Sequence, residues 1–222
     1  MPTWLKILLA VVVLWRVVRY FRPAKQAAFT PRKHWALALA QPMVEATGLT
    51  GFMSPATTAL NEETRKLFRT PLLHQMELRP TTSDDEVRAH LSRVLEAQWF
   101  RADLHALQPT DDPRAALAFA CVRMAFLVRN AMLMGWADPM VAWRVLLLNA
   151  QRAQDCFAGW EDFGHAFIAG RRQWVAAFRA DPLGSGFDAY HVRQLLGLDG
   201  AWAGLPWPGE PALSPSAAHT AA

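Results

Sequence analysis

The chain has 222 residues, of which 52% are apolar and 19% charged, enough for one packed domain of ordinary size with shorter segments at its ends. This composition excludes a chain that is disordered throughout. Two cysteines, Cys121 and Cys156, are too few for a secreted disulfide scaffold. We expect both to be buried free thiols in a reducing compartment.

The net charge of +4 is distributed unevenly along the chain. Residues 1–44 hold seven basic side chains and no acid, whereas residues 45–222 hold 16 basic and 19 acidic side chains. The body of the chain lacks the basic stripe with interleaved aromatic residues that is typical of nucleic-acid-binding proteins. We therefore expect no nucleic-acid partner.

Residues 4–21 read WLKILLAVVVLWRVVRYF and predict a transmembrane helix, so that residues 1–22 would form a membrane anchor. A helix of this length spans roughly 27 Å, close to the hydrocarbon thickness of about 30 Å. Its Leu, Ile and Val residues favour insertion by about 3 to 6 kcal/mol, which outweighs a cost of at most roughly 3 kcal/mol for Arg16. A helix that lies in the membrane interface is the alternative.

Basic residues mostly follow this apolar run, and only Lys6 precedes it. The positive-inside rule then places the C-terminal side in the cytoplasm, as a single-pass protein of the bacterial inner membrane. The run is followed by Arg-Tyr-Phe-Arg-Pro rather than by small residues, which argues against a cleaved signal peptide.

Residues 23–56 contain four prolines and two glycines and predict a connector, with room for a short helix over 34–41. Residues 57–68 predict a helix that ends before Pro71. Ser83 and Glu86 have the spacing of a capping box, which predicts a helix from there to about Phe100.

The segment Pro113–Met134 predicts the central helix of a bundle. Asp112-Pro113 is a helix start signal, and Gly135 is suited to a left-handed C-cap. Apolar residues occur on all sides of this helix, and a helix of that kind is buried on all sides.

Further helices are predicted from a second Asp-Pro start at Asp138 to about Phe157, over 160–178 and over 187–196. Strand patterns are scarce, so the predicted fold class is all-α, with a helical domain over 57–196. Residues 197–222 are rich in Gly, Pro, Ala and Ser, and we expect a disordered tail there.

An aromatic stripe in the helix over 160–178 includes one arginine. Arg171 falls between Phe167 and Trp174, with Gly164 on the stripe and Gly170 beside it, where small residues let another helix approach. Arg123 and Arg129 likewise lie among apolar residues, in the central helix. A buried arginine requires a carboxylate or carbonyls as partner. These arginines would be structural tie-points that pair with Asp138, Asp155, Glu161 or Asp162, or would line a cleft for an anionic ligand.

Glu161, Asp162 and His165 lie within one helical turn. They could share a face for acid–base chemistry or contribute to a metal site. They could also be the acidic first turn of a helix, where carboxylates offset the helix dipole, and we favour this interpretation. The sequence contains no phosphate loop, nucleophile motif or paired metal-ligand spacing, so we expect no cofactor and no metal.

The stretch from about Ala115 to Leu196 resembles a bacterial family of unknown function, the one that contains the YbeU- and YbeR-type proteins. The matching residues are Phe119, Arg123, Arg129, Gly135-Trp136, Ala142-Trp143, Gly159 to Gly164, and Gly170-Arg171 with Trp174. Weaker similarity extends back over 64–104. The family usually has an Asp at the position of Ala120, so any pairing or chemistry of that Asp is missing here. The resemblance implies a helical domain and no particular activity.

We therefore predict a membrane-anchored helical domain that acts as an interaction or scaffold module for a protein partner at the cytoplasmic face. One alternative is an enzyme or anion binder that uses Arg123, Arg129, Arg171, Glu161 and His165 in one pocket. Another is an immunity-type protein in bacterial competition.

Overall fold

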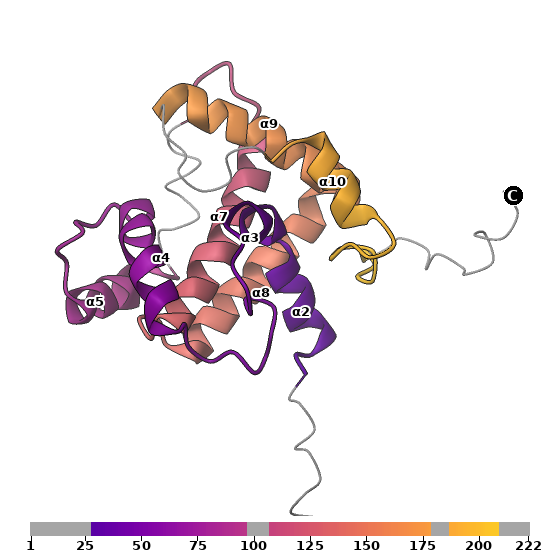
Figure 1. The fold of residues 1–222 in the computed structure, drawn as a ribbon. Helices are drawn as coiled ribbons and strands as arrows, with labels where there is room; N and C mark the ends of the chain where they lie inside the picture. The colour runs from indigo at the N-terminus through magenta and orange to yellow at the C-terminus, as the bar shows by residue number, and fades with distance from the viewer. Residues whose placement is uncertain (1–27, 97–106, 179–186, 209–222) are drawn as a thin grey trace, which may run out of the picture.

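A computed structural model of the protein describes residues 28–96, 107–178 and 187–208. Within these ranges the chain forms eight helices and no strand (Figure 1). They are α2 (Pro31–Ala38), α3 (Gln41–Thr47), α4 (Glu62–Gln75), α5 (Asp84–Val94), α7 (Pro113–Leu133), α8 (Pro139–Cys156), α9 (Trp160–Phe178) and α10 (Ala189–Leu196). The all-α prediction is confirmed for the described part of the chain.

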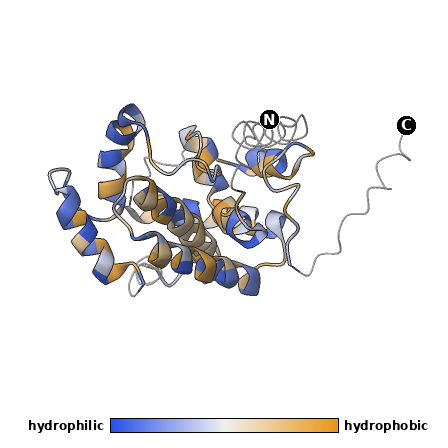
Figure 2. Ribbon diagram, turned by 90° about the horizontal axis from the view of Figure 1, so that it is seen from below, coloured by the Kyte–Doolittle hydropathy of each residue, from blue (hydrophilic) through white to orange (hydrophobic). Residues whose placement is uncertain are grey.

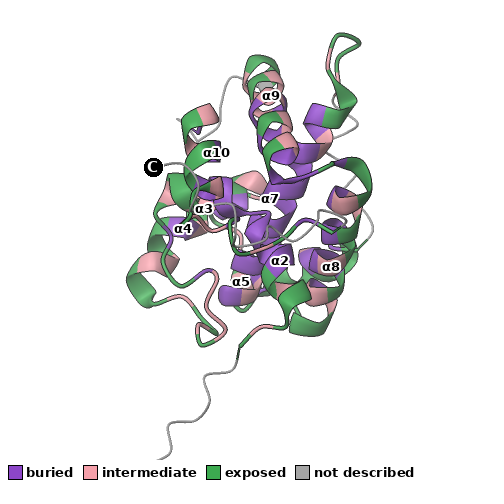
Figure 3. Cartoon of the chain, turned by 90° about the vertical axis from the view of Figure 1, so that its right-hand side faces the viewer, coloured by how far each residue is buried: buried purple, intermediate pink, exposed green. Residues whose placement is uncertain are grey.

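Helix α7 is the core of the domain. It is buried along nearly its whole length (Figure 3), and α2, α3, α8 and α9 all pack against it. Its apolar residues are spread around the helix axis, whereas the surrounding helices show separate polar and apolar faces (Figure 2). The predicted buried central helix is therefore confirmed.

The helix boundaries follow local capping chemistry where the sequence predicted it. The Asp112 carboxylate accepts a hydrogen bond from the Arg114 amide (2.8 Å), and the Asp138 carboxylate accepts from the Met140 and Val141 amides. The capping box is present, since the Ser83 amide donates to the Glu86 carboxylate at 2.7 Å. Gly135 ends α7 with a φ of 70°, in the left-handed region that favours glycine.

Several boundaries differ from the prediction. Helix α4 begins at Glu62, five residues later than predicted. Helix α4 continues through Pro71 to Gln75 instead of ending before the proline. Pro71 has no N–H, so the Leu67 carbonyl loses its helical hydrogen bond. This carbonyl lies on the exposed face of the helix, where the Leu67 side chain is 70% exposed. The burial of Leu72 and Leu73 holds the helix together beyond the proline. Helix α10 begins at Ala189, two residues later than predicted. Helix α5 ends at Val94, and the remainder of the range predicted for it runs into residues 97–106, outside the described residues.

The prediction of a connector over 23–56 is wrong for residues 31–47. Helices α2 and α3 lie in this range, and the stretch from Trp35 to Met43 is buried in the core. Prolines did not prevent these helices, because Pro31 and Pro42 occupy first-turn positions, where a missing N–H costs nothing.

The prediction of a disordered tail from residue 197 is wrong as far as residue 208. Trp202 and Trp207 are almost completely buried, and the Trp202 indole N–H donates to the Ala38 carbonyl at 2.9 Å. These two large side chains cover the surface that α2 and α9 would otherwise expose. Residues 209–222 lie outside the described residues.

The predicted membrane anchor, residues 1–22, also lies outside the described residues. Among the helices that the structure describes, α7 alone is long and apolar enough to cross a membrane, and 89% of its most apolar window is buried inside the protein. Its hydrophobicity is that of a core helix.

Candidate functional site: arginine tie-points of the central helix

Arg123, in the middle of α7, is 7% exposed. Its Nε donates to the side-chain carbonyl of Gln75 at 3.0 Å, and its Nη2 donates to the Gln75 backbone carbonyl at 3.4 Å. The guanidinium also lies over the Trp174 ring, 4.5 Å from its centroid. Arg123 therefore joins α7 to the end of α4 and to α9, and the structure brings Arg123 and Trp174 together.

Arg129 lies about 9 Å further along α7, given the helical rise per residue, and is 4% exposed. Its guanidinium donates to three backbone carbonyls, those of Phe52 (3.2 Å), Ser54 (3.1 Å) and Thr57 (2.9 Å). Burial lowers the pKa of Arg129 to about 10, so the side chain remains charged at neutral pH. Its role in the described structure is to hold the loop between α3 and α4 against the core.

Asp162, in the first turn of α9, pairs with Arg114 in the first turn of α7. It also accepts a hydrogen bond from the Ala158 amide at 2.8 Å. The hydrogen bond from Arg114 is the main cause that holds the pKa of Asp162 below its usual value. This geometry supports the helix-start interpretation, with an additional contact between two helices.

Glu161 and His165 are exposed on the same helix, and Arg171 is half-buried. The expectation that Arg171 is buried as Arg123 is buried is therefore wrong. Among the described residues, no group of His, Cys, Asp and Glu gathers closely enough to hold a metal ion.

Three of the four carboxylates predicted as partners of Arg123, Arg129 and Arg171 make other contacts in the described structure. Asp138 caps α8, Asp155 accepts a hydrogen bond from Gln151, and Asp162 pairs with Arg114. The cysteine prediction holds in part, since neither cysteine forms a disulfide, but only Cys121 is buried and Cys156 is exposed.

A cluster of arginines that the sequence did not predict lies at the C-terminal end of α7. Arg65 donates to the Met134 carbonyl at 2.8 Å, and Arg88 donates to the Gly135 carbonyl at 3.0 Å. Arg65 and Arg69 both pair with Asp84. Burial raises the pKa of Asp84, but the hydrogen bonds from Arg69 and Arg65, together with the charge of Arg69, outweigh that effect and the pKa lies below its usual value. Cations at a helix C-terminus are stabilising, but these arginines lie 47 and 69 positions from the carbonyls they contact, so no local sequence pattern indicates the cluster.

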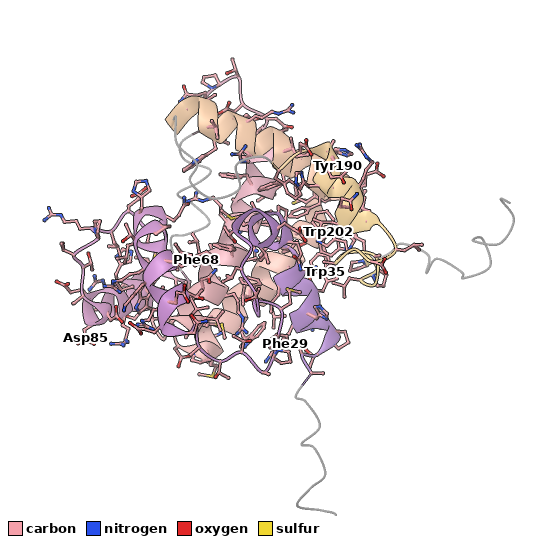
Figure 4. The ribbon with its side chains drawn as sticks, viewed as in Figure 1. Phe29, Trp35, Phe68, Asp85, Tyr190 and Trp202 are labelled. Atoms are coloured by element: carbon pink, nitrogen blue, oxygen red, sulfur yellow. The ribbon has the colours of Figure 1, made fainter. Side chains whose placement is uncertain are left out.

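A second missed feature is the aromatic cluster of Trp35, Trp160, Trp202 and Trp207. The rings of Trp160 and Trp202 stack with centroids 4.9 Å apart, and Trp35 lies 4.7 Å from Trp160 and 4.9 Å from Trp207. Figure 4 shows Trp35 and Trp202 on neighbouring segments. The cluster joins the first described helix to the last described residues, and only the high tryptophan content hinted at it.

The glycines predicted to allow close helix approach do so. A Cβ atom at Gly170 would lie 2.0 Å from the Ala115 carbonyl oxygen of α7, and one at Gly164 would lie 2.9 Å from Val192 of α10. Side chains at these positions would push α7 and α10 away from α9, so the two glycines set the spacing of three helices.

Residues 38–207 match the family described as "Protein of unknown function (DUF1266)". The match covers well over half of the chain, and the protein therefore belongs to this family of helical domains of unknown function. It begins at Ala38, the last residue of α2, and ends at Trp207, so it includes α3 of the predicted connector and the two tryptophans of the predicted tail. Searches of curated proteins and of solved structures found no match.

Proposed function

We propose that this protein is a membrane-tethered interaction module whose helical domain binds a protein partner at the cytoplasmic face of a bacterial inner membrane. The observation that supports it best is that the buried polar residues of the candidate site make contacts inside the domain. Arg114, Arg123 and Asp162 join helices to one another, and Arg129 holds the loop between α3 and α4. These contacts use the polar groups inside the domain and leave its surface for binding.

The membrane tether is supported by the sequence of residues 4–21, which is long and apolar enough to span a bilayer. Basic residues dominate on its C-terminal side, which favours a cytoplasmic domain. The sequence motif from Gly159 to Gly164 supports a closer relation to the bacterial YbeU- and YbeR-type proteins within the family.

The partner surface is proposed at α10 and the turn that follows it. Tyr190 is 56% exposed and Leu198 is 98% exposed, and they lie at the two ends of this short helix. Exposed apolar residues are common individually, but aromatic side chains that stand in solvent are enriched where proteins bind each other.

The alternative, an anion-binding or catalytic cleft, has less support from the same residues. The Arg129 guanidinium is occupied by three carbonyls, and Glu161 and His165 lie exposed at a different part of the domain from the Arg123–Trp174 contact.

The test is photo-crosslinking in cells that express the full chain. A photoreactive phenylalanine analogue replaces Tyr190 or Leu198. In a matched control it replaces Asp85 on α5, whose side chain is 93% exposed and which lies on the opposite side of the domain from Tyr190 (Figure 4). We expect a discrete protein adduct from the first two positions and none from the third. Equal labelling at all three positions, or no adduct at any, would contradict the partner role. Extraction of the chain by alkaline carbonate would contradict the tether.

A further inference from the structure

The outward face of α8 carries large apolar side chains. Met140 is 71% exposed and Leu148 is 59% exposed, and Trp143 and Leu147 are only partly buried. The opposite face of the helix packs into the core through Ala142, Val145, Leu146 and Asn149. Among the residues that the structure describes, none forms an apolar cover over Met140 and Leu148.

Trp143 connects this face to the start of α2. The Phe29 ring lies 5.3 Å from the Trp143 ring in an edge-on arrangement, and the Lys33 Nζ lies 4.5 Å from its centroid. Figures 1 and 3 both show α2 beside α8, and Figure 4 places Phe29 at the edge of the domain. We refer to this combined area as the α2–α8 surface; its residues are Phe29, Arg32, Lys33, Met140, Trp143, Leu147 and Leu148.

The charge of the α2–α8 surface is unfavourable for the helix that carries it. The first turn of α2 contains Arg32 and Lys33 and no acidic residue, although the N-terminus of a helix already has a partial positive charge. Basic residues there reduce the stability of the helix. Residues that reduce stability locally are expected at sites that serve function. A negatively charged partner would offset both sources of positive charge.

The distance to the predicted anchor limits what that partner can be. The apolar run ends at Phe21 and the described chain begins at residue 28, so a fully extended connection reaches at most roughly 25 Å. Arg22 and Lys25 lie within this connection. If residues 4–21 span the bilayer, the start of α2 is held close to the lipid headgroups.

We infer that the α2–α8 surface rests on the cytoplasmic leaflet and binds anionic lipid headgroups. Arg32 and Lys33 contact the headgroups, Met140 and Leu148 enter the interface, and Trp143 lies at the depth that tryptophan prefers in membranes. This inference rests on the proposed membrane tether and adds a fixed orientation, in which α10 faces away from the bilayer.

The experiment uses the full chain reconstituted in vesicles, with Cys156→Ser to remove the exposed thiol. An environment-sensitive fluorophore is attached to a cysteine at Leu148→Cys or, as the control, at Tyr190→Cys. Lipids with a quenching group near the headgroup then report which position touches the bilayer. We expect at least about twofold stronger quenching at position 148 than at 190 in vesicles with anionic lipid, and a smaller difference in purely zwitterionic vesicles.

The double variant Arg32→Glu, Lys33→Glu separates lipid binding from folding. Acidic residues in the first turn favour the helix dipole, so this variant preserves α2. We expect it to weaken docking roughly tenfold while the chain still sediments with the vesicles.

Equal quenching at the two positions in a chain that remains in the vesicles would overturn this inference and leave the tether intact. A chain that does not associate with vesicles would overturn the tether itself. Protection of position 148 from a water-soluble quencher without quenching by lipid would show that a second copy or residues 4–21 cover the surface, and would also overturn the inference.

Discussion

The two halves of α7 are held in different ways. In the N-terminal half, α9 approaches so closely at Gly170 that a methyl group would touch the Ala115 carbonyl oxygen, and one ion pair, Arg114 with Asp162, lies at the rim. In the C-terminal half, arginines reach backbone carbonyls: Arg129 from within the helix, and Arg65 and Arg88 from its neighbours.

This difference follows from what each half contacts. Helix α9 is a regular partner whose backbone hydrogen bonds are internal, so close packing is sufficient there. The C-terminal half contacts the irregular segment over 48–61, whose carbonyls have no helical partner. The carbonyls at the end of α7 also have none. Long guanidinium side chains satisfy several such carbonyls at once. The two halves should therefore respond to different kinds of substitution.

Gly170→Ala should have the largest effect. The added Cβ would lie 2.0 Å from a backbone oxygen that cannot move independently, so we expect the free energy of unfolding to fall by about 3 kcal/mol despite the better helix propensity of alanine. Urea denaturation of the detergent-solubilised chain measures it. Gly204→Ala is the control, because nothing lies within 4 Å of its Cβ position. Equal effects would show that α7 and α9 are not tightly packed.

Arg129→Met should cost nearly as much, about 2 to 3 kcal/mol, because it leaves the carbonyls of Phe52, Ser54 and Thr57 without this donor. Arg129→Lys should restore only part of the stability, since one ammonium cannot span three carbonyls. Arg93→Met, on the exposed side of α5, should change stability by less than about 0.5 kcal/mol. The denaturant midpoints of unfolding of the three variants measure these effects. A midpoint for Arg129→Met equal to that of Arg93→Met would contradict the role of Arg129.

Asp84→Asn should cost about 1 to 2 kcal/mol, because two arginines lose their shared carboxylate. Asp85→Asn is a matched control, since it removes a charge from the same helical turn but from a side chain that is 93% exposed. If both variants lose the same stability, the loss comes from the helix dipole and not from the arginine cluster.

Asp162→Asn should have the smallest effect at neutral pH, about 0.5 to 1 kcal/mol, because its pair with Arg114 is partly exposed. The pKa of Asp162 is lowered in the folded protein. Its contribution is therefore complete above the unfolded value near 3.8 and is lost as the pH falls through the folded pKa. The unfolding free energy of the variant should depend less on pH in this acidic range than that of the unchanged chain, with Glu161→Gln as control.

The sequence predicted those parts of the fold that local chemistry determines. Asp112-Pro113, Asp138-Pro139 and the Ser83 capping box each specify a helix start within four residues, and the apolar surroundings of α7 required burial. Those signals involve neighbours in the chain, so they can be recognised without knowledge of the fold.

The sequence could not predict contacts between distant segments. One partner of Arg123 is Gln75, 48 positions away, and no pattern near either residue indicates this contact. Trp202 and Trp207 lie in a stretch whose composition is typical of a tail, and only the surface formed by α2 and α9 gives them a place to be buried. For the candidate site, the residue types were recognised but their partners were not.

The bond from the Trp202 indole to the Ala38 carbonyl joins positions 164 residues apart. Because the ribosome synthesises the chain from its N-terminus, α2 emerges long before the tryptophans that cover it. The nascent domain must therefore wait for its final segment before the core closes. A chain that terminates before Trp202 would leave Trp35, Trp160 and Phe163 uncovered and open to chaperones or aggregation.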